Sequence, residues 1–247
     1  MIVAIIQARM GSTRFPGKVL KKLYKKTILQ IIFERVQKSE KIDKIIFATS
    51  NNTLDDKIEN FCKYKNYFCF RGSEKNVLKR YYDCAKKFNA KTIIRLTADC
   101  PLVDPIIIDK VISMHYKTKS HYSSNTIPPE KSKWPNGSDV EVFSFKSLEQ
   151  AYKNAKKLSE KEHVTFYIWK NNNNKFKKSQ LPNNYNWSDY RYTLDYKEDY
   201  VVLKKIYKQL INKKIFGYTN EIIKIINNNP GIKKINNNYN FEDGWNR

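Results

Sequence analysis

An alternation of apolar and amphipathic segments in the first half of the chain constrains its fold most strongly. Apolar segments that suit buried strands occupy residues 2–7, 44–49, 67–70 and 92–97, and a helical pattern follows each of them. Pro105 stands at the first position of the last of these helices, where its missing N–H leaves no hydrogen bond unmade. Strands and helices that alternate at such lengths form βαβ units with parallel strands. We therefore expect an α/β fold, with a mostly parallel central sheet and helices on both of its faces.

The rhythm of the sequence changes after about residue 117. Further strands are expected at residues 120–125, 139–143, 176–181 and 191–194. Further helices are expected at residues 145–157, 159–170, 197–211 and 218–228. We see neither an internal repeat nor a linker, and therefore expect one domain over residues 1–247 with an insertion at about 120–185. The tail carries Tyr239, Phe241 and Trp245, which give it enough apolar surface to dock on the domain.

The charge of the chain suggests a polyanionic partner, but the composition weakens that suggestion. The sequence holds 47 Lys and Arg against 24 Asp and Glu, a formal net charge of +23, and such an excess can bind nucleic acid without reading its sequence. However, 39 of the basic residues are Lys and 8 are Arg, a bias that an AT-rich coding sequence would produce. The chain contains no recognised nucleic-acid-binding motif, so we expect no nucleic-acid partner.

Membrane, secreted and disulfide-bonded classes of protein are not indicated. No apolar run approaches the roughly 20 residues of a membrane span, and the N-terminus lacks the basic start of a signal peptide. The four cysteines form no CxxC pair and have no metal-ligand spacing with the three histidines. We therefore expect a cytoplasmic protein with reduced thiols and no membrane partner.

The most informative segment is the polar loop after the first strand, Gln7 to Lys18 (QARMGSTRFPGK). It should lie at the carboxyl end of a buried strand, where open α/β sheets bind ligands. Its glycines, hydroxyl groups and cations suit a cradle for phosphate, although an ordinary basic surface loop is the alternative. The spacing of Gly11 and Gly17, with Val19 after the lysine, differs from that of a Walker A loop, and the GxGxxG pattern is absent.

The few arginines gather at predicted strand ends or in the adjoining turns. Five of the eight are placed there: Arg9, Arg14, Arg71, Arg95 and Arg191. Because the guanidinium fork grips phosphate or carboxylate at two points, arginine in a lysine-rich chain indicates an anion-binding task. Structural salt bridges are the alternative explanation.

Two carboxylates are expected near the same crevice. Asp99 directly follows the predicted strand 92–97, and Asp195 follows the predicted strand 191–194. Carboxylates at adjacent strand ends would hold Mg²⁺ through oxygen ligands and leave positions for substrate phosphates. Asp195 could instead cap the following helix, and capping is compatible with metal binding.

Six segments of the sequence resemble one known family. They are IIQARMGSTRFPGKVL, FRGSEKNVLKRYY, RLTADCPLVDP, GSDVEVF, EHVTFYIW and RYTLDYKEDY, and the similarity runs from residue 2 to about 207. In this order they are similar to the SpsF-like cytidylyltransferases of spore-coat polysaccharide biosynthesis, which are related to the CMP-Kdo and CMP-sialate synthetases. The resemblance implies a Rossmann-like nucleotidyltransferase fold of the GT-A type, and an enzyme that uses CTP and Mg²⁺ and releases pyrophosphate.

The resemblance also implies roles for individual residues. The nucleotide-binding set would be Gln7, Ala8, Arg9, Gly11, Ser12, Arg14, Lys18, Arg71 and Thr97. The metal would be bound by Asp99 and Asp195. The catalytic set would be Arg9, Arg14, Lys18 and Asp99. The family usually has Pro where this chain has Phe166, a departure that concerns the acceptor side of the site.

The residues that contact the acceptor are less well defined. Asp139 and Glu141 alternate with valines, so their carboxylates project from one face of a strand. Glu162 and His163 lie at a predicted helix start, where the resemblance suggests an active-site contribution. Glu162 also has capping-box spacing from Ser159, which accounts for it without any substrate. We expect the acceptor to be bound by Asp139, Glu141 and His163.

The resulting prediction is an Mg²⁺-dependent cytidylyltransferase that transfers CMP from CTP to a small acceptor in surface glycan biosynthesis. The acceptor would be an acidic sugar activated at its anomeric hydroxyl, or a phosphorylated or phosphonate compound activated at its phosphoryl oxygen. By analogy with the family, we expect a homodimer built through residues near 120–185. The alternative function is that of a catalytically inactive relative, which would serve as a binding or scaffold protein in glycan synthesis.

Overall fold

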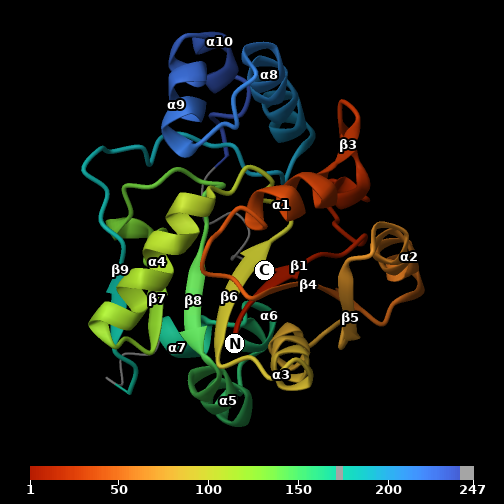
Figure 1. Ribbon diagram of the computed structural model, residues 1–247, viewed down its shortest axis with the longest axis vertical. Helices are drawn as coiled ribbons and strands as arrows, with labels where there is room; N and C mark the ends of the chain where they lie inside the picture. The colour runs from red at the N-terminus through yellow and green to blue at the C-terminus, as the bar shows by residue number, and fades with distance from the viewer. Residues whose placement is uncertain (171–174, 240–247) are drawn as a thin grey trace.

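A computed structural model describes residues 1–170 and 175–239 of the chain. Within these ranges, seven strands form one central sheet in the order β5–β4–β1–β6–β8–β7–β9 (Figure 1). Their bounds are β1 Ile2–Gln7, β4 Lys44–Ser50, β5 Phe68–Gly72, β6 Thr92–Thr97, β7 Tyr122–Ser124, β8 Glu141–Ser144 and β9 Lys178–Gln180. Two short strands, β2 (Lys22–Leu23) and β3 (Lys26–Thr27), form a separate antiparallel hairpin.

The central sheet is parallel apart from one strand. β1 pairs in parallel with β4 and β6, and β4 pairs in parallel with β5. β8 runs antiparallel to both of its neighbours, β6 and β7, whereas β7 and β9 are parallel. The predicted α/β fold with a mostly parallel sheet is therefore confirmed. The region expected as an insertion supplies β7, β8 and β9, so it completes one half of the same sheet.

Helices surround the sheet. The α-helices of the described residues are α1 Ile28–Val36, α2 Asp56–Lys65, α3 Val77–Lys87, α4 Pro105–Thr118, α5 Phe145–Asn154, α6 Leu158–Glu162, α7 Phe166–Trp169, α8 Lys197–Lys213, α9 Thr219–Asn227 and α10 Pro230–Lys233. Three short 3-10 turns are η1 (Lys18–Leu20), η2 (Thr53–Asp55) and η3 (Pro129–Lys131). None of the helices in these residues has both the length and the apolar character that crossing a membrane requires.

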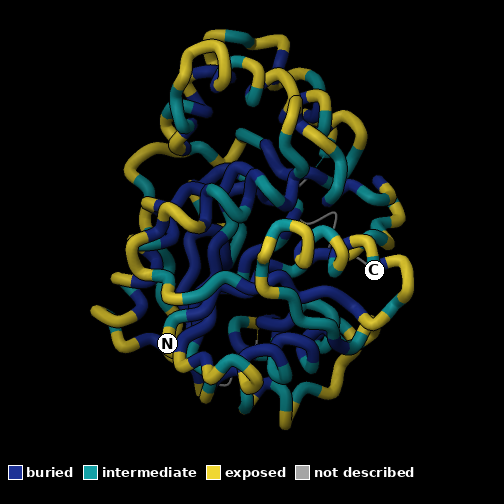
Figure 2. Tube along the Cα trace, turned by 45° about the vertical axis from the view of Figure 1, so that its right-hand side comes forward, coloured by how far each residue is buried: buried dark blue, intermediate teal, exposed yellow. Residues whose placement is uncertain are grey.

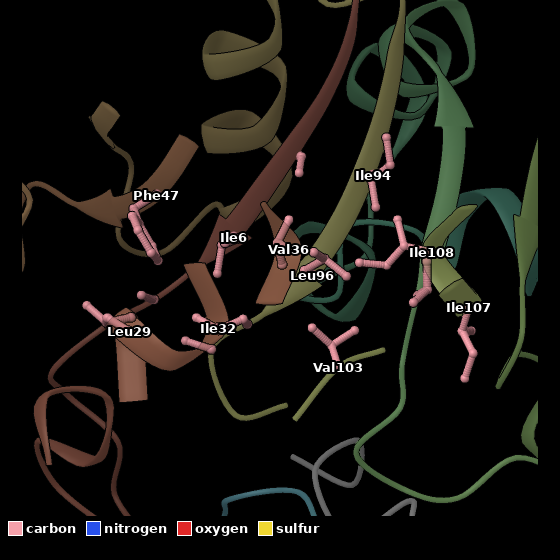
Figure 3. Close-up of a cluster of buried hydrophobic side chains, with 14 of the residues drawn as sticks. Ile6, Leu29, Ile32, Val36, Phe47, Ile94, Leu96, Val103, Ile107 and Ile108 are labelled. Carbon is pink, nitrogen blue, oxygen red and sulfur yellow. The ribbon is translucent and has the colours of Figure 1, made fainter. Parts of the chain in front are cut away.

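Apolar side chains pack on both faces of the sheet, whose strands are largely buried (Figure 2). On one face, Leu29, Ile32 and Val36 of α1 join side chains of α2 and α4 against the central strands (Figure 3). On the other face, α3, α5 and α7 contribute a second cluster. A third cluster unites α8, α9 and α10 with α1 and the β2–β3 hairpin, beyond one end of the sheet at the top of Figure 1.

Two of the predicted elements are wrong. The helix expected at 159–170 is interrupted, since α6 ends at Glu162 and α7 begins at Phe166, with Val164 between them at a left-handed φ of 52°. The strand expected at 191–194 does not join the central sheet. Among the described residues, Arg191 forms an isolated bridge with Asn136 instead. Backbone hydrogen bonds to a loop took the place of the strand pairing that the apolar pattern suggested.

The start of the predicted tail packs on the domain. The ring of Tyr239 stacks on that of Tyr196, with centroids 3.8 Å apart and planes 6° from parallel. Its hydroxyl donates a hydrogen bond to Glu198 at 3.2 Å. The other two aromatic residues expected to dock, Phe241 and Trp245, lie outside the described residues.

Candidate active site

A cleft of about 240 Å³ opens at the carboxyl ends of β1 and β6. It is lined by the loop after β1, the end of β6, the start of β8 and the turn between α6 and α7. Most of the predicted site residues lie on its walls: Gln7, Ala8, Arg9, Ser12, Arg14, Lys18, Thr97, Asp99, Asp139, Glu141, His163 and Asp195. The cleft thus occupies the end of the sheet where parallel α/β proteins bind their ligands.

The loop after β1 is held by a residue that the sequence did not point to. The Met10 N–H donates to Oδ1 of Asp55 at 2.7 Å, and Asp55 is buried at the end of η2. Within the loop, the N–H groups of Ser12 and Gly17 both donate to the carbonyl oxygen of Met10. Gly17 has a φ of 68°, in the left-handed region that glycine adopts without strain. These contacts give the loop a defined, curved backbone along one wall of the cleft.

Lys18 connects the two predicted metal-binding carboxylates. Its Nζ lies 2.9 Å from Oδ1 of Asp195 and 3.7 Å from Oδ2 of Asp99. The same ammonium group donates to the carbonyl oxygen of Leu194 at 2.5 Å. The two carboxylates come together because the Leu194 N–H and the Thr193 hydroxyl both donate to the carbonyl oxygen of Asp99. The loop, the end of β6 and the segment before α8 therefore meet at one cation.

Arg14 brings a second cation to Asp195. Its Nη2 lies 2.9 Å from Oδ1 of Asp195, and its Nη1 donates to the Tyr196 hydroxyl at 3.2 Å. Burial opposes ionisation of Asp195, but Lys18 and Arg14 outweigh it and lower the pKa of the carboxyl group. Asp195 does not cap α8, because Asp199 accepts the N–H groups of residues 195 and 196. The Asp195 carboxylate is therefore ionised and directed to the cations.

The carboxylate oxygens of Asp99 and Asp195 are of the kind that could hold a magnesium ion together with phosphate oxygens. The part of the chain that the structure describes has no cluster of three or more His, Cys, Asp or Glu side chains that could hold an ion alone. The two carboxylates nevertheless already share one cation, the Lys18 ammonium group. Mg²⁺ is commonly held by one or two carboxylates, with phosphate oxygens and waters completing its octahedron. Asp99 and Asp195 therefore suit Mg²⁺ that arrives with substrate phosphates.

A second group of ionisable side chains lines the cleft from β6, β8 and the turn after α6. We call this group the inner wall; it consists of Arg95, Asp139, Glu141, Glu162 and His163. Arg95 and Glu141 are directly opposite each other in the β6–β8 pairing, and Nη1 of Arg95 donates to Oε1 of Glu141. The other carboxylate oxygen of Glu141 accepts hydrogen bonds from the hydroxyl groups of Tyr122 (2.7 Å) and Thr165 (2.5 Å).

Asp139 is surrounded by uncharged donors. Its carboxylate accepts hydrogen bonds from the Thr126 hydroxyl (2.8 Å), the Gly137 N–H (3.0 Å) and the Cys100 thiol (3.4 Å). Burial raises the pKa of this carboxyl group. Gly137 permits the close approach of this segment, since a Cβ there would lie 2.6 Å from the Thr193 nitrogen. Asp139 is thus fixed in place by backbone packing.

His163 reaches the cleft from the turn between α6 and α7. The left-handed φ of 52° at Val164 is unusual for a β-branched residue, and such conformations often occur at functional sites. The His163 ring stacks on Phe166 with centroids 4.3 Å apart, so the residue that replaces the usual proline contacts the site directly. Burial lowers the pKa of His163 to about 4. The imidazole is therefore neutral near pH 7.

Glu162 lacks the capping role that its spacing from Ser159 suggested. Glu160 takes that role, because its Oε2 accepts the N–H groups of Lys156 (3.0 Å) and Lys157 (3.1 Å). The Glu162 side chain lines the cleft instead.

Two predicted nucleotide-binding residues do not line the cleft. Arg71, at the end of β5, pairs with Asp56 and Glu59 of α2 and donates to two backbone carbonyl groups nearby. Gly11 is exposed on the loop, and a Cβ there would meet no atom within 4 Å. Among the five arginines predicted at strand ends or turns, the cleft is lined by Arg9, Arg14 and Arg95.

The chain is similar to known proteins in both sequence and fold. The family model described as cytidylyltransferase matches residues 3–227. An uncharacterised protein of Methanocaldococcus jannaschii is 40% identical over 243 residues, which cover 96% of this chain and 95% of that protein. The spore coat polysaccharide biosynthesis protein SpsF of Bacillus subtilis is 34% identical over 238 residues, 93% of this chain and 95% of that protein. The solved structure of a cytidylyltransferase from Leptospira borgpetersenii has a TM-score of 0.86 at 33% identity, over 94% of this chain and 95% of that one.

Proposed function

This chain belongs to the cytidylyltransferase family, and from that premise we propose that it transfers CMP from CTP to a small anionic acceptor and releases pyrophosphate. The acceptor is an acidic sugar, or a phosphorylated or phosphonate compound, and its product serves surface glycan biosynthesis. The name of the relative SpsF, a spore coat polysaccharide biosynthesis protein, supports that role. The observation that carries the proposal is the position of Lys18 between Asp99 and Asp195, beside a loop that carries Arg9 and Arg14.

In the proposed reaction, an acceptor oxygen attacks the α-phosphorus of CTP, and the bond from that phosphorus to the pyrophosphate oxygen breaks. Such transfers depend on positioning and charge stabilisation more than on a covalent intermediate. Arg9, Arg14 and Lys18 neutralise the negative charge of the departing pyrophosphate. Asp195 orients two of these cations through its ion pairs with Arg14 and Lys18.

Asp99 and Asp195 would hold Mg²⁺ together with the nucleotide phosphates, and the ion would supply Lewis-acid stabilisation of phosphate charge. The chain itself keeps the two carboxylates close through the hydrogen bonds of Thr193 and Leu194 to the Asp99 carbonyl oxygen. The Lys18 ammonium group lies against both carboxylates and offsets part of their negative charge.

We place the acceptor along the inner wall, where Asp139, Glu141 and His163 would support it. His163 has a buried Nε2 with no hydrogen-bond partner among the described residues, and its imidazole is neutral near pH 7. A neutral imidazole nitrogen can accept a hydrogen bond from an acceptor hydroxyl group.

The proposal is tested by incubating the purified protein with Mg²⁺, each nucleoside triphosphate in turn, and a panel of acceptors. The panel contains sugar acids and phosphorylated or phosphonate compounds, and the measurement is pyrophosphate release. We expect release with CTP and an anionic acceptor, and none with CTP alone. If no acceptor supports release and calorimetry detects no CTP binding, the proposal is contradicted in favour of an inactive scaffold protein.

We also propose that the enzyme acts in the cytoplasm as a homodimer built through residues near 120–185, as in the family that it resembles. Sedimentation velocity of the purified chain tests the oligomeric state, and a monomer at all accessible concentrations would contradict it. Nucleic acid is not an expected partner. Polynucleotide binding that falls steeply with added salt would contradict that statement.

A further inference from the structure

Buried polar atoms without a hydrogen-bond partner gather in the cleft. In the described residues seven side chains carry such an atom, and three of the seven line the cleft: Gln7 (Oε1), Arg95 (Nε) and His163 (Nε2). A buried polar group that makes no hydrogen bond is costly, so each one calls for an explanation. Three such groups around one cavity indicate a polar ligand that completes them.

Arg95 is a cation inside a central strand. β6 lies between β1 and β8, so Arg95 pairs with Ile5 on one side and with Glu141 on the other. Its side chain is 16% exposed. Burial opposes ionisation of the guanidinium group, but Glu141 outweighs it and raises the pKa of Arg95. The strand therefore carries a permanent positive charge into the wall of the cleft.

Glu141 is engaged in holding that charge. Its two carboxylate oxygens accept hydrogen bonds from Arg95, Tyr122 and Thr165, and its side chain is 7% exposed. A carboxylate with three donors has little capacity left for an acceptor. We therefore reassign Glu141, predicted as an acceptor contact, as a positioning residue for the Arg95 guanidinium group.

Arg95 is also the one permanent cation of the inner wall. The remaining cationic side chains that line the cleft in the described residues belong to the loop after β1: Arg9, Arg14 and Lys18. Asp139 and Glu162 are carboxylic, and His163 is neutral near pH 7 because burial lowers its pKa to about 4. An anionic group that binds on this wall thus has a single cationic partner.

We propose that Arg95 anchors the acceptor through an oxyanion, which is either a carboxylate or a phosphoryl or phosphonate group. This inference rests on the proposed function and specifies its acceptor site. Arginine binds oxyanions at two points, and Nε of Arg95 has an N–H donor that no described residue uses. In the same cleft, Oε1 of Gln7 can accept a hydrogen bond from a hydroxyl or amino group of the same molecule, and Nε2 of the neutral His163 ring can accept or donate one according to its tautomer. The ligand class is a small oxyanion that also carries hydrogen-bond donors.

The kinetic test replaces Arg95 by Lys, which keeps the positive charge but removes the planar guanidinium group that can bind an oxyanion at two points. With an acceptor that supports pyrophosphate release, we expect R95K to raise the KM for that acceptor at least tenfold and to change the KM for CTP less than twofold. E141Q should raise the acceptor KM in the same direction by a smaller factor, because it loosens the guanidinium group. An unchanged acceptor KM in R95K, or equal changes for CTP and acceptor, would overturn the proposal.

Arg80 offers a matched control. Arg80 is a buried residue of α3, its Nε donates to the Ser73 carbonyl oxygen at 3.0 Å, and, like the Nε of Arg95, its Nη1 is buried without a partner among the described residues. It does not line the cleft. R80K should therefore leave both KM values unchanged, which separates an acceptor contact from a general effect of changing a buried arginine.

A binding test needs no turnover. The chain has eight arginines, so arginine-selective ¹⁵N labelling gives a simple Nε–H spectrum. The probes are added in the presence of CTP. 3-deoxy-manno-octulosonate tests whether Arg95 binds a carboxylate, and methylphosphonate and glycerol 1-phosphate test whether it binds a phosphoryl or phosphonate group. Galactose is the uncharged control. The Arg95 resonance is identified by its absence in R95K. We expect it to shift with either the carboxylate probe or the phosphoryl and phosphonate probes, and not with galactose.

If R95K does not fold, E141Q identifies the same resonance by displacing it. No shift with any anionic probe would overturn the anchor. A shift without pyrophosphate release from any acceptor would contradict the proposed function but support the anchor, so the two failures are distinguishable.

Discussion

The two sides of the cleft hold charge in opposite proportions. The loop side has three cations for two carboxylates: Arg9, Arg14 and Lys18 against Asp99 and Asp195. The inner wall has one cation for three carboxylates: Arg95 against Asp139, Glu141 and Glu162. The first balance suits a ligand with several negative charges, such as a triphosphate, and the second suits a ligand with one anionic group and several hydrogen-bond donors. Under the proposed function, we assign the loop side to the nucleotide and call it the donor half, and we assign the inner wall to the acceptor and call it the acceptor half.

The two halves also differ in how their cations are supported. Lys18 and Arg14 lie on a loop and share the carboxylate of Asp195, whereas Arg95 lies in a strand and is matched to the opposite residue, Glu141. A substitution in one half should therefore change the kinetic constants for the ligand of that half and leave those for the other ligand unchanged. Asp99, at the boundary of the two halves, is the exception.

The largest effect is expected for Asp99→Asn. The substitution removes one of the two charged oxygen donors beside Lys18, and we expect kcat to fall on the order of 10³-fold with little change in the melting temperature. Steady-state pyrophosphate release and thermal unfolding provide the measurements. Asp83→Asn is the matched control, since Asp83 forms a partly exposed ion pair with Lys79 on α3, outside the cleft. Near wild-type turnover in Asp99→Asn would contradict the metal assignment.

A smaller effect, confined to the donor half, is expected for Arg14→Lys. Lysine cannot bond Asp195 and the Tyr196 hydroxyl simultaneously in the way that the guanidinium group does. We expect kcat/KM for CTP to fall about 10- to 30-fold, with the acceptor KM unchanged, which is the lower part of the range for a hydrogen bond to a charged group (about 1.5–3 kcal/mol) because lysine keeps the positive charge. Lys26→Arg, in the β2–β3 hairpin, serves as the control. A change in the acceptor KM alone would argue against the separation of the two halves.

A further step down is Tyr196→Phe, which removes the hydroxyl group that accepts from Arg14 and keeps the ring stacked on Tyr239. Loss of one such hydrogen bond is worth about 1 kcal/mol, so kcat/KM for CTP should fall about fivefold. Tyr239→Phe loses its bond to Glu198 and should have no kinetic effect. An equal kcat/KM for CTP in the wild type, Tyr196→Phe and Tyr239→Phe would show that Tyr196 does not position Arg14.

The smallest effect is expected for His163 in the acceptor half, on the pH dependence of the free energy of unfolding below pH 6.5. Burial lowers the pKa of His163 to about 4 in the folded chain, from the ordinary value of about 6.5. Between these values the unfolded chain binds the extra proton, so the free energy of unfolding falls as the pH drops from about 6.5 to about 4. His163→Gln should reduce that slope by at most one proton.

His115 gives the comparison for this experiment. Burial also lowers its pKa to about 4, but it lies outside the cleft, where its Nδ1 lies 3.0 Å from the Ser123 hydroxyl oxygen. His115→Gln should reduce the acid slope similarly and leave the acceptor KM unchanged, whereas His163→Gln should raise that KM. Urea unfolding at several pH values measures both slopes. An unaltered slope in His163→Gln would contradict the buried, neutral state of this imidazole.

The donor half was largely predictable from the sequence because its features are local. The strand 2–7 and the loop after it are contiguous, and the position of a loop at the carboxyl end of a strand follows from βαβ topology. Asp99 was found for the same reason. Arg71 shows the limit of this reasoning, since its place at a strand end was correct but its side chain turns to Asp56 and Glu59 of α2.

The acceptor half was less predictable because it depends on contacts between distant segments. The sequence placed Arg95 in a strand without a partner, and nothing local indicated that β8 would run antiparallel and bring Glu141 opposite it. The turn at Val164 was hidden because the residues around it have the apolar spacing of one continuous helix. Asp55, which holds the loop through Met10, lies 45 positions away in the sequence and carries no motif.

The direction of β8 has a consequence for how such a fold changes over time. Because β8 is antiparallel to β6, its beginning lies at the cleft, and residues that lead into it, such as Asn136 and Asp139, line the cleft. Under the proposed function, we expect substitutions there to change which molecule accepts the nucleotide and to leave the geometry of β1 and its loop, on the other side of β6, unchanged. A mutagenesis library confined to residues 126–141 and 162–166 would thus explore new acceptors without sacrificing the chemistry. Because one strand is reversed, we expect acceptor specificity to evolve independently of the residues that bind the nucleotide.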